Sequence, residues 1–339
     1  MEKVTRIVIL SLCAALILGS CTKKHHQPEE TLKAPLDFTA VSQDSGMKAV
    51  LEANSLANYH LDFGAWGIAR QEGNSTSYVL WSSDSMSEVY AEPDSNAAGE
   101  YTGTFIPREP AYWLTGFAYN FIAVAPYTEG ASDLDVDHFV DTQTGKDAIT
   151  FTFDQGAKYT AGDFDFDLMG AAAATDAITT KPTTQPLTFW HLFSQININV
   201  SFVDANGTAV STGTVSQMRL CNVKSKADYT LTFGGANNLS VACGSHTDDK
   251  TISLSGSSAT LHILPQSITG FELYLDFTLD GAAFNDFKVN LNTTGHPTTY
   301  NWNEVYNWNI IIGPKADISF SFTVLPWVGV PVGDEIPII

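Results

Sequence analysis

The chain has 339 residues, 44% hydrophobic and 12% aromatic, which is typical of folded protein and excludes a disordered chain. Its 17 Lys and Arg against 37 Asp and Glu give a net charge of −20 at pH 7. Such an acidic chain is not expected to bind nucleic acid, whose phosphates need a basic surface, and its charge favours solubility at a cell surface.

The first residues predict an export signal with a lipid attachment site. A short basic segment precedes an apolar run at residues 7–18, which is too short to span a membrane and fits a signal peptide. Two small residues then precede Cys21, as in bacterial lipoprotein signals. We therefore expect residues 1–20 to be a lipoprotein signal peptide, Cys21 to carry the lipid, and residues 21–34 to form a tether. The alternative is an ordinary secretory signal followed by a chance Cys.

After the tether, the hydrophobic pattern has a period of two. In residues 195–202, 271–279 and 317–327, apolar side chains alternate with polar ones, which is typical of strands with one buried and one wet face. Further strands are expected at residues 36–42, 77–83, 99–107, 118–127, 148–154, 215–223, 228–234 and 259–265. Clusters of Gly, Asn, Asp, Ser and Pro separate them, so we expect an all-β protein built of β-sandwiches.

Two segments are candidates for helix and one for a domain junction. Residues 47–59 have the composition of a few helical turns, and residues 167–177 contain helix formers but little amphipathic stripe. The stretch 175–186 is rich in Thr and Pro and lies near the middle of the chain. We therefore place one domain at residues 35–180 and a second at residues 181–339.

Two acidic stretches are candidates for metal sites. The stretch 133–141 spaces its first aspartates like a calcium loop, but His138 stands where Gly is needed and Thr144 where a bidentate Glu is needed. A solvated acidic loop is the favoured interpretation. Residues 162–170 alternate Asp with Phe and Leu, as a strand with one wet face does. We expect no metal site.

No catalytic signature stands out. His191 lies among large apolar residues and is expected to be a hydrogen-bonded core side chain. No G-x-S-x-G, P-loop or dinucleotide-binding motif occurs. A glycosidase-type pair of carboxylates stays open, because acidic residues are plentiful and none is singled out. We predict that the protein is not an enzyme and uses no cofactor.

Two cysteines remain in the body of the chain, Cys221 and Cys243. In an exported protein they can form a disulfide. Equally, each can be a small buried side chain. The sequence leaves the two interpretations open.

Four groups of residues, taken together with their order and spacing along the chain, form a recognisable pattern. They are FGAWGIA (63–69), AYWLTGFAYNFIAVAPY (111–127), FDLMGAAAATDAI with PLTFWHLFSQININV (166–178 and 186–200), and YNWNIIIG with ISFSFTVLPW (306–313 and 318–327). In these residues the chain resembles the fimbrillins, or type V pilins, which Gram-negative anaerobes export as lipoproteins. The third group is the most specific, because it is similar to the Asp-Leu-Met and Leu-x-Phe-x-His-x-x-Ser-x-Ile passages of that family.

The resemblance implies two tandem transthyretin-like β-sandwich domains in a structural or adhesive subunit of cell-surface fimbriae. In polymerising fimbrillins the lipid delivers the precursor to the outer membrane, and a trypsin-like protease cuts after a basic residue that follows the first strand. The groove so opened accepts a C-terminal strand of another subunit. Here residues 36–42 would be the lost strand and residues 328–339 the donor. The implied partners are other fimbrial subunits, the outer membrane through Cys21, and host proteins or glycans.

The chain departs from this pattern at the protease site. No Arg lies between Cys21 and Arg70, so an Arg-specific protease lacks a site directly after residues 36–42. Three outcomes stay open: a cut after Lys48, a cut after Arg70 with a longer segment lost, and no cut. An uncut chain would keep its lipid as an anchor or accessory subunit, so the role as shaft or accessory subunit also stays open.

A second hypothesis comes from a different class of function. A surface-anchored lipoprotein built of β-sandwiches could bind glycans by stacking exposed aromatic side chains on sugar rings. Trp81, Trp113 and Trp302 are the candidates. Core packing is the alternative for each of them, because Trp is mostly buried.

Overall fold

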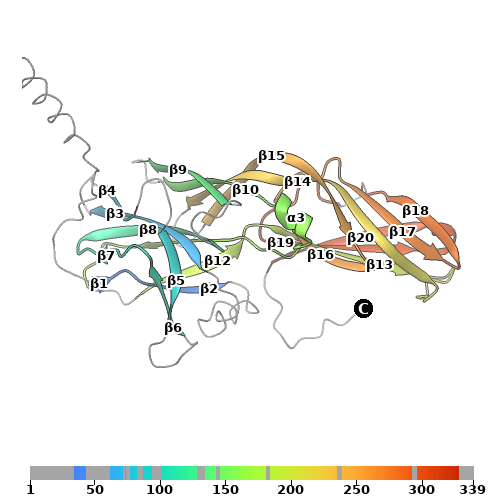
Figure 1. Cartoon of the computed structure of the whole chain (residues 1–339), viewed down its shortest axis with the longest axis horizontal. Coiled ribbons are helices and arrows are strands. Elements are labelled where there is room, and N and C mark those ends of the chain that lie inside the picture. Colours follow the sequence, from blue (N-terminus) through green and yellow to red (C-terminus); the bar gives the residue numbers. More distant parts are fainter. Residues whose placement is uncertain are drawn as a thin grey trace, which may run out of the picture. The chain divides into compact units, whose positions relative to one another are not determined.

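Strands make up nearly all of the regular structure in the computed structural model of the chain (Figure 1). Its described residues are 34–42, 62–71, 73, 77–81, 87–93, 101–127, 134–142, 146–180, 184–234, 239–291 and 296–327. Within them the helical elements are one α-helix, α3 (Gly156–Ala161), and one 3-10 turn, η2 (Pro314–Ala316). The prediction of an all-β protein is confirmed.

The first sheet has eight strands, and its pairings close into a ring. The order is β4 (Ser77–Val79), β3 (Phe63–Gln71), β5 (Ser87–Pro93), β6 (Tyr101–Pro107), β2 (Phe38–Ser42), β12 (Gln185–His191), β11 (Met169–Thr175) and β8 (Phe117–Ala125). β3 also pairs with β8, so the strands from β3 round to β8 form a closed circuit. Beside it, the short strand β1 (Ala34–Pro35) pairs with β7 (Tyr112–Trp113).

The ring has an aromatic core and a second apolar face. Phe38, Phe63, Phe121 and Trp113 are fully buried together in one cluster. β3 is buried over Phe63–Ala69 without alternation, because Trp66 and Ile68 belong to another cluster on the opposite face. That second cluster joins the ring to residues of β10 (Lys146–Asp154) and β14 (Gly213–Phe233).

The second sheet is organised around one long strand. Its order is β18 (Ala282–Val289), β17 (Glu272–Leu279), β14 (Gly213–Phe233), β10 (Lys146–Asp154) and β9 (Leu134–Thr142), and β15 (Leu239–Leu254) also pairs with β14. β14 is continuous over 21 residues, so the prediction of separate strands at 215–223 and 228–234 is wrong. The alternation continues between them because Ser225, although polar, is buried and donates a hydrogen bond to the Asp248 carbonyl at 3.1 Å.

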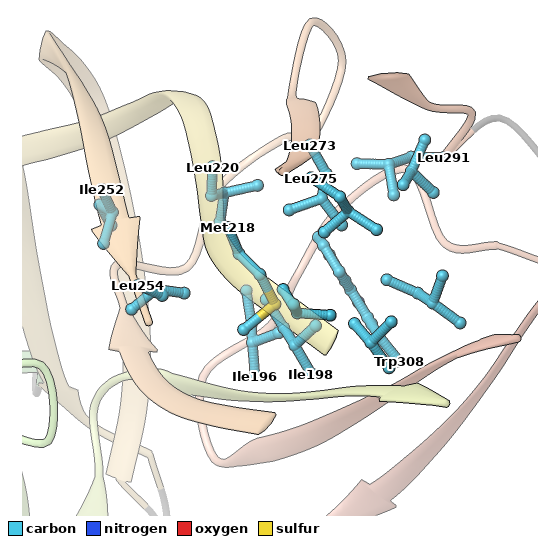
Figure 2. Close-up of a cluster of buried hydrophobic side chains, with 14 of the residues drawn as sticks. Ile196, Ile198, Met218, Leu220, Ile252, Leu254, Leu273, Leu275, Leu291 and Trp308 are labelled. Atoms are coloured by element: carbon cyan, nitrogen blue, oxygen red, sulfur yellow. The ribbon is translucent and has the colours of Figure 1, made fainter. Parts of the chain in front are cut away.

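The third sheet has four strands and packs on part of the second. The order is β16 (Ser258–Ile263), β13 (Ser194–Phe202), β19 (Glu304–Ile312) and β20 (Ile318–Pro326). Figure 2 shows the shared core, in which Ile196 and Ile198 of β13 and Trp308 of β19 meet Met218 of β14 and Leu275 of β17. These side chains come from alternate positions of their strands, as the sequence predicted for 195–202 and 271–279.

Three other expectations about local structure need correction. Residues 167–177, a helix candidate, contain strand β11, whose small side chains fit between neighbours: a Cβ on Gly170 would lie 3.0 Å from Leu192 and Leu239. The favoured loop at 133–141 is instead strand β9, since Leu134, Val136 and Val140 alternate with acidic residues. The strand expected at 162–170 begins only at Met169.

Strand pairing crosses the proposed domain boundary at residue 180. β10 precedes residue 180 but pairs with β14, and β12 follows it but pairs with β2 and β11. These pairings link strands on the two sides of the boundary, and the division into domains at residues 35–180 and 181–339 stays a prediction. The helix candidate at residues 47–59 lies outside the described residues.

Candidate functional site

The first described segment inserts its apolar side chains into the core of the ring. Ala34, Leu36, Phe38 and Ala40 are each at most 6% exposed, whereas the residues between them are half-buried or exposed. The Phe38 ring lies 5.4 Å from the Phe121 centroid and 5.8 Å from that of Phe63, edge-on to both. The strand expected at residues 36–42 therefore buries its alternate side chains Leu36, Phe38 and Ala40, and the segment fills a slot in the aromatic core.

The backbone of this segment is held unevenly. β2 pairs in parallel with β12 from Phe38 to Ser42, but its pairing with β6 is limited to Phe38 opposite Phe105. Before β2, the Leu36 amide donates to the Ala111 carbonyl at 2.9 Å. β2 is the strand between β6 and β12, so without it the ring would be open and both neighbours would have an unpaired edge.

The basic residues weighed as protease sites differ in their structural context. Arg70 lies in β3, opposite Ser77 of β4 on one side and Ala118 of β8 on the other. Proteases cut most readily at exposed loop tips, so a cut after Arg70 requires β3 to leave the sheet first. Lys48 and Cys21 lie outside the described residues, as does the donor segment 328–339.

A second constellation, which we name the Trp327 cluster, consists of Asp167, His191, His262 and Trp327. The Trp327 indole is 7% exposed and stacks on the His191 ring, with centroids 3.9 Å apart and an interplanar angle of 5°. His262 meets the same indole edge-on at 4.6 Å. His191 Nδ1 is 2.6 Å from Asp167 Oδ2, which confirms the expected hydrogen-bonded core histidine.

Most polar atoms of the Trp327 cluster are withdrawn from water. His262 Nδ1 lies 3.1 Å from the Phe166 carbonyl, and burial lowers the pKa of His262 below its usual value. Among the described residues, His191 Nε2 and Asp167 Oδ1 have no hydrogen-bond partner. The Trp327 amide donates to the Asn303 carbonyl at 2.8 Å, so backbone and side chain together fix the point where β20 ends.

The Trp327 cluster unites residues that lie far apart in the chain. Asp167 comes from the Asp-Leu-Met passage, His191 from the Leu-x-Phe-x-His passage, and Trp327 from the closing strand. Sequence reasoning found each passage but did not bring them together.

A family comparison agrees with these passages. The family model described as fimbrillin-like matches residues 63–327 of this chain. The chain belongs to the fimbrillin-like family. The match begins at β3 and ends at Trp327, so it covers the second sheet, the third sheet and every strand of the ring except β2.

Solved structures support the fold. A fimbrial protein from Bacteroides vulgatus matches with a TM-score of 0.53 and 14% identity, over 87% of this chain and 99% of its own. A fimbrial assembly protein from Parabacteroides distasonis matches with a TM-score of 0.48 and 9% identity, over 87% and 99%. At such low identity the first match concerns fold alone, and nothing is concluded from the second, whose TM-score is below 0.5. No curated protein matches the chain.

The two cysteines of this fimbrillin-like chain are not brought together. Both are free thiols. On β14, Cys221 lies opposite Glu272, whereas Cys243 of β15 lies opposite Tyr229. Those two points on β14 are separated by roughly 26 Å at the usual rise per residue, far beyond the reach of a disulfide. Burial raises the pKa of Cys243 to about 12, so its thiol stays protonated at neutral pH.

The tryptophans proposed as sugar platforms are mostly in the core. Trp113 is fully buried and Trp81 is 3% exposed, with its Nε1 donating to the Glu109 carbonyl at 2.9 Å. Trp302 is half-buried. Trp81 and Trp113 are therefore wrong as platforms, since the aromatic core of the ring needs them.

The described part of the chain offers neither a metal-binding cluster nor a membrane-spanning helix. It contains no cluster of three or more His, Cys, Asp or Glu arranged to hold a metal ion. Nor does any helix in it have the length and apolar character to cross a bilayer.

Proposed function

We propose that this fimbrillin-like protein is a structural subunit of cell-surface fimbriae, made as a lipoprotein precursor and assembled by strand exchange. One observation carries the proposal: buried side chains anchor the segment from Ala34 to Ala40, whereas among the described residues β2 pairs with β12 along its length but with β6 at Phe38 alone. Such a segment can be replaced by another of similar pattern without rebuilding the neighbouring strands. The family membership supports the same conclusion.

The proposed sequence of events begins at the lipid. Cys21 tethers the precursor at the outer membrane, and a protease cuts after Lys48, between β2 and β3. The released segment takes β1 and β2 with it, which leaves the edges of β6 and β12 unpaired. A strand from residues 328–339 of another subunit then pairs with these edges. Because this contact is head-to-tail and does not close on itself, it produces a filament.

The energetics explain why the cut would drive assembly. Removing the segment uncovers the pocket that Leu36 and Phe38 fill, and each buried side chain of this size is worth about 1.5–3 kcal/mol. The opened subunit is therefore unstable until a donor replaces the lost contacts. The Trp327 cluster contributes by fixing Trp327, the residue that directly precedes the donor segment in the chain.

Limited proteolysis of the purified precursor tests this function. Trypsin should cut near Lys48 and give multimers that survive SDS without boiling. Lys48→Gln should abolish both, whereas the matched variant Lys33→Gln, on the other side of the strand, should not. Deleting residues 328–339 should leave the cut intact and remove the multimers. A cut that yields only monomers would refute strand exchange.

The proposal has an uncut form that the same experiment identifies. Because Arg70 is enclosed by β4 and β8, resistance near Lys48 would leave the precursor whole. The protein would then remain on the membrane through Cys21 as an anchor or accessory subunit. Its partners would still be other fimbrial subunits, with host proteins or glycans as adhesion targets.

A further inference from the structure

A pocket of about 630 Å³ opens in the half of the molecule that holds the third sheet. Five strands and the segment before β11 contribute to it. Its lining consists of Phe164, Ser216, Gln217, Ser253, Leu254, Ser255, Ala259, Thr260, Asp276 and Asn285. The volume lies within the range of about 300–1,000 Å³ that small-molecule sites occupy.

The pocket follows from the way in which two sheets separate. β15 pairs with β14 only as far as Leu254 opposite Met218, while Gly213–Gln217 of β14 continues with β17 alone. After β15 the chain turns into β16, which is an outer strand of the third sheet. The pocket therefore lies between the β14 edge and β16. Register shifts in the β14–β17 and β17–β18 pairings lie beside it, and such bulges redirect side chains.

The lining offers unused hydrogen-bonding groups. The side chains of Gln217, Ser253, Ser255 and Asn285 hydrogen-bond to no other described residue. By contrast, Ser216 already donates to the Asp276 carbonyl and Thr260 to Asn197 Oδ1. Hydroxyl and amide groups both donate and accept, which suits a ligand rich in hydroxyl groups.

The charge and aromatic content of the pocket narrow the chemical class of the ligand further. The lining contains no Lys or Arg, its one acidic side chain is Asp276, which pairs with Arg219 at 3.3 Å, and the chain carries a net charge of −20. Anionic ligands are therefore disfavoured. Phe164 is half-buried at the pocket wall, where its side chain packs against the core shared by the second and third sheets, and its carbonyl accepts a hydrogen bond from the His262 amide at 2.7 Å. A ring held in this way can stack on the apolar face of a sugar.

We propose that this pocket binds a neutral glycan, with Phe164 as the stacking platform and Gln217, Ser253, Ser255 and Asn285 as hydrogen-bonding groups. Phe164 thus takes the role of sugar platform that the sequence suggested for tryptophans. This glycan binding does not depend on strand exchange. An extended peptide pairing with the β14 edge is the competing occupant, and the test separates the two.

Calorimetric titration of the mature chain with neutral tetrasaccharides tests the proposal. The probes are lacto-N-tetraose, maltotetraose, chitotetraose and mannotetraose, together with sialyl-lacto-N-tetraose as the anionic counterpart. At least one neutral probe should bind saturably, and sialylation should weaken binding. Asn285→Ala combined with Gln217→Ala should lower the affinity about tenfold or more, which is about 1.4 kcal/mol.

The matched control is Ser321→Ala, an exposed position on β20 away from the pocket, which should leave the affinity unchanged. All variants should keep the thermal midpoint of the parent, so a loss of binding cannot reflect unfolding. Binding to none of the neutral probes would overturn the proposal. So would glycan binding that the double variant leaves intact, or saturation of the pocket by an extended peptide alone.

Discussion

β2 and β13 bury their side chains alike but are held by their backbones differently. Over Phe38–Ala40 of β2 and along all of β13, buried residues alternate with more exposed ones. β13 is paired with β19 along its whole length, from Ser194 to Phe202, and with β16 over most of it. β2 has one full neighbour and touches the other only at Phe38. Side-chain burial therefore specifies where a strand fits, whereas backbone pairing on both sides makes the strand resist removal from the sheet.

The comparison predicts its largest effect in hydrogen exchange. Amides of β13 such as Ile198 should exchange only by global unfolding, whereas those of β2 should exchange by local opening, at least about 100-fold faster. The measurement is native-state exchange followed by mass spectrometry of peptides that cover the two strands. Equal protection of β2 and β13 would show that the difference in their backbone pairing does not affect local opening.

Truncation of the buried anchor of β2 should be the next largest effect. Phe38→Ala should lower the free energy of unfolding of the ring by about 3–5 kcal/mol, because it empties a packed aromatic site. Thr39→Ala, one residue along and half-buried, is the matched control and should cost little. Urea unfolding of both variants measures the difference, and a loss below about 1 kcal/mol for Phe38→Ala would show that the slot is not filled as described.

Gly67 in β3 tests the packing around Phe121, whose ring contacts Phe38 of β2. A Cβ at Gly67 would lie 2.7 Å from Leu80 and 2.9 Å from the Phe121 ring. Gly67→Ala should therefore cost about 1–3 kcal/mol through overpacking. Gly244→Ala is the matched control, since it also lies in a strand but has no atom within 4 Å of the added Cβ. Equal thermal midpoints for the two variants would argue against this packing.

The smallest expected effect is a dependence of stability on pH. Burial lowers the pKa of His262 below the value of 6.5 that it has when unfolded, so the unfolded chain binds the proton more readily. Stability is then fully present above about pH 6.5 and declines as the pH falls, by at most about 1.4 kcal/mol per pH unit for one group. His296 acts in the same direction, so the variant His262→Gln should reduce the slope without removing it. Urea midpoints at several pH values measure this, and an unchanged slope would contradict it.

The sequence predicted local features well and long-range ones poorly. Alternation located β2, β13, β17 and β20, because each exposes one face to water. The same pattern divided β14 in two, because Ser225 is polar and interrupts the apolar alternation in the sequence. In the structure Ser225 is buried, and its hydroxyl donates to the Asp248 carbonyl. Alternation could not show that β3 and β8 close the ring, since pairing between distant strands leaves no local pattern.

The candidate sites also contain local features, which the sequence predicted, and long-range ones, which it did not. The buried face of residues 36–42 and the core role of His191 could be predicted from neighbouring residues. The stacking of His191 on Trp327 joins residues 136 positions apart, and the glycan pocket depends on where β15 leaves β14. Neither has a signature in any single stretch, so a three-dimensional structure was needed to find them.

The uninterrupted β14 has a mechanical consequence. One end of this strand is hydrogen-bonded to β17 and the other to β10, while β15 runs alongside most of its length (Figure 1). A pulling force along the strand would load these ladders in shear, so that many hydrogen bonds resist at once and do not unzip singly. A subunit in a fibre under flow could thus carry tension from one end of β14 to the other without a flexible linker as its weakest point.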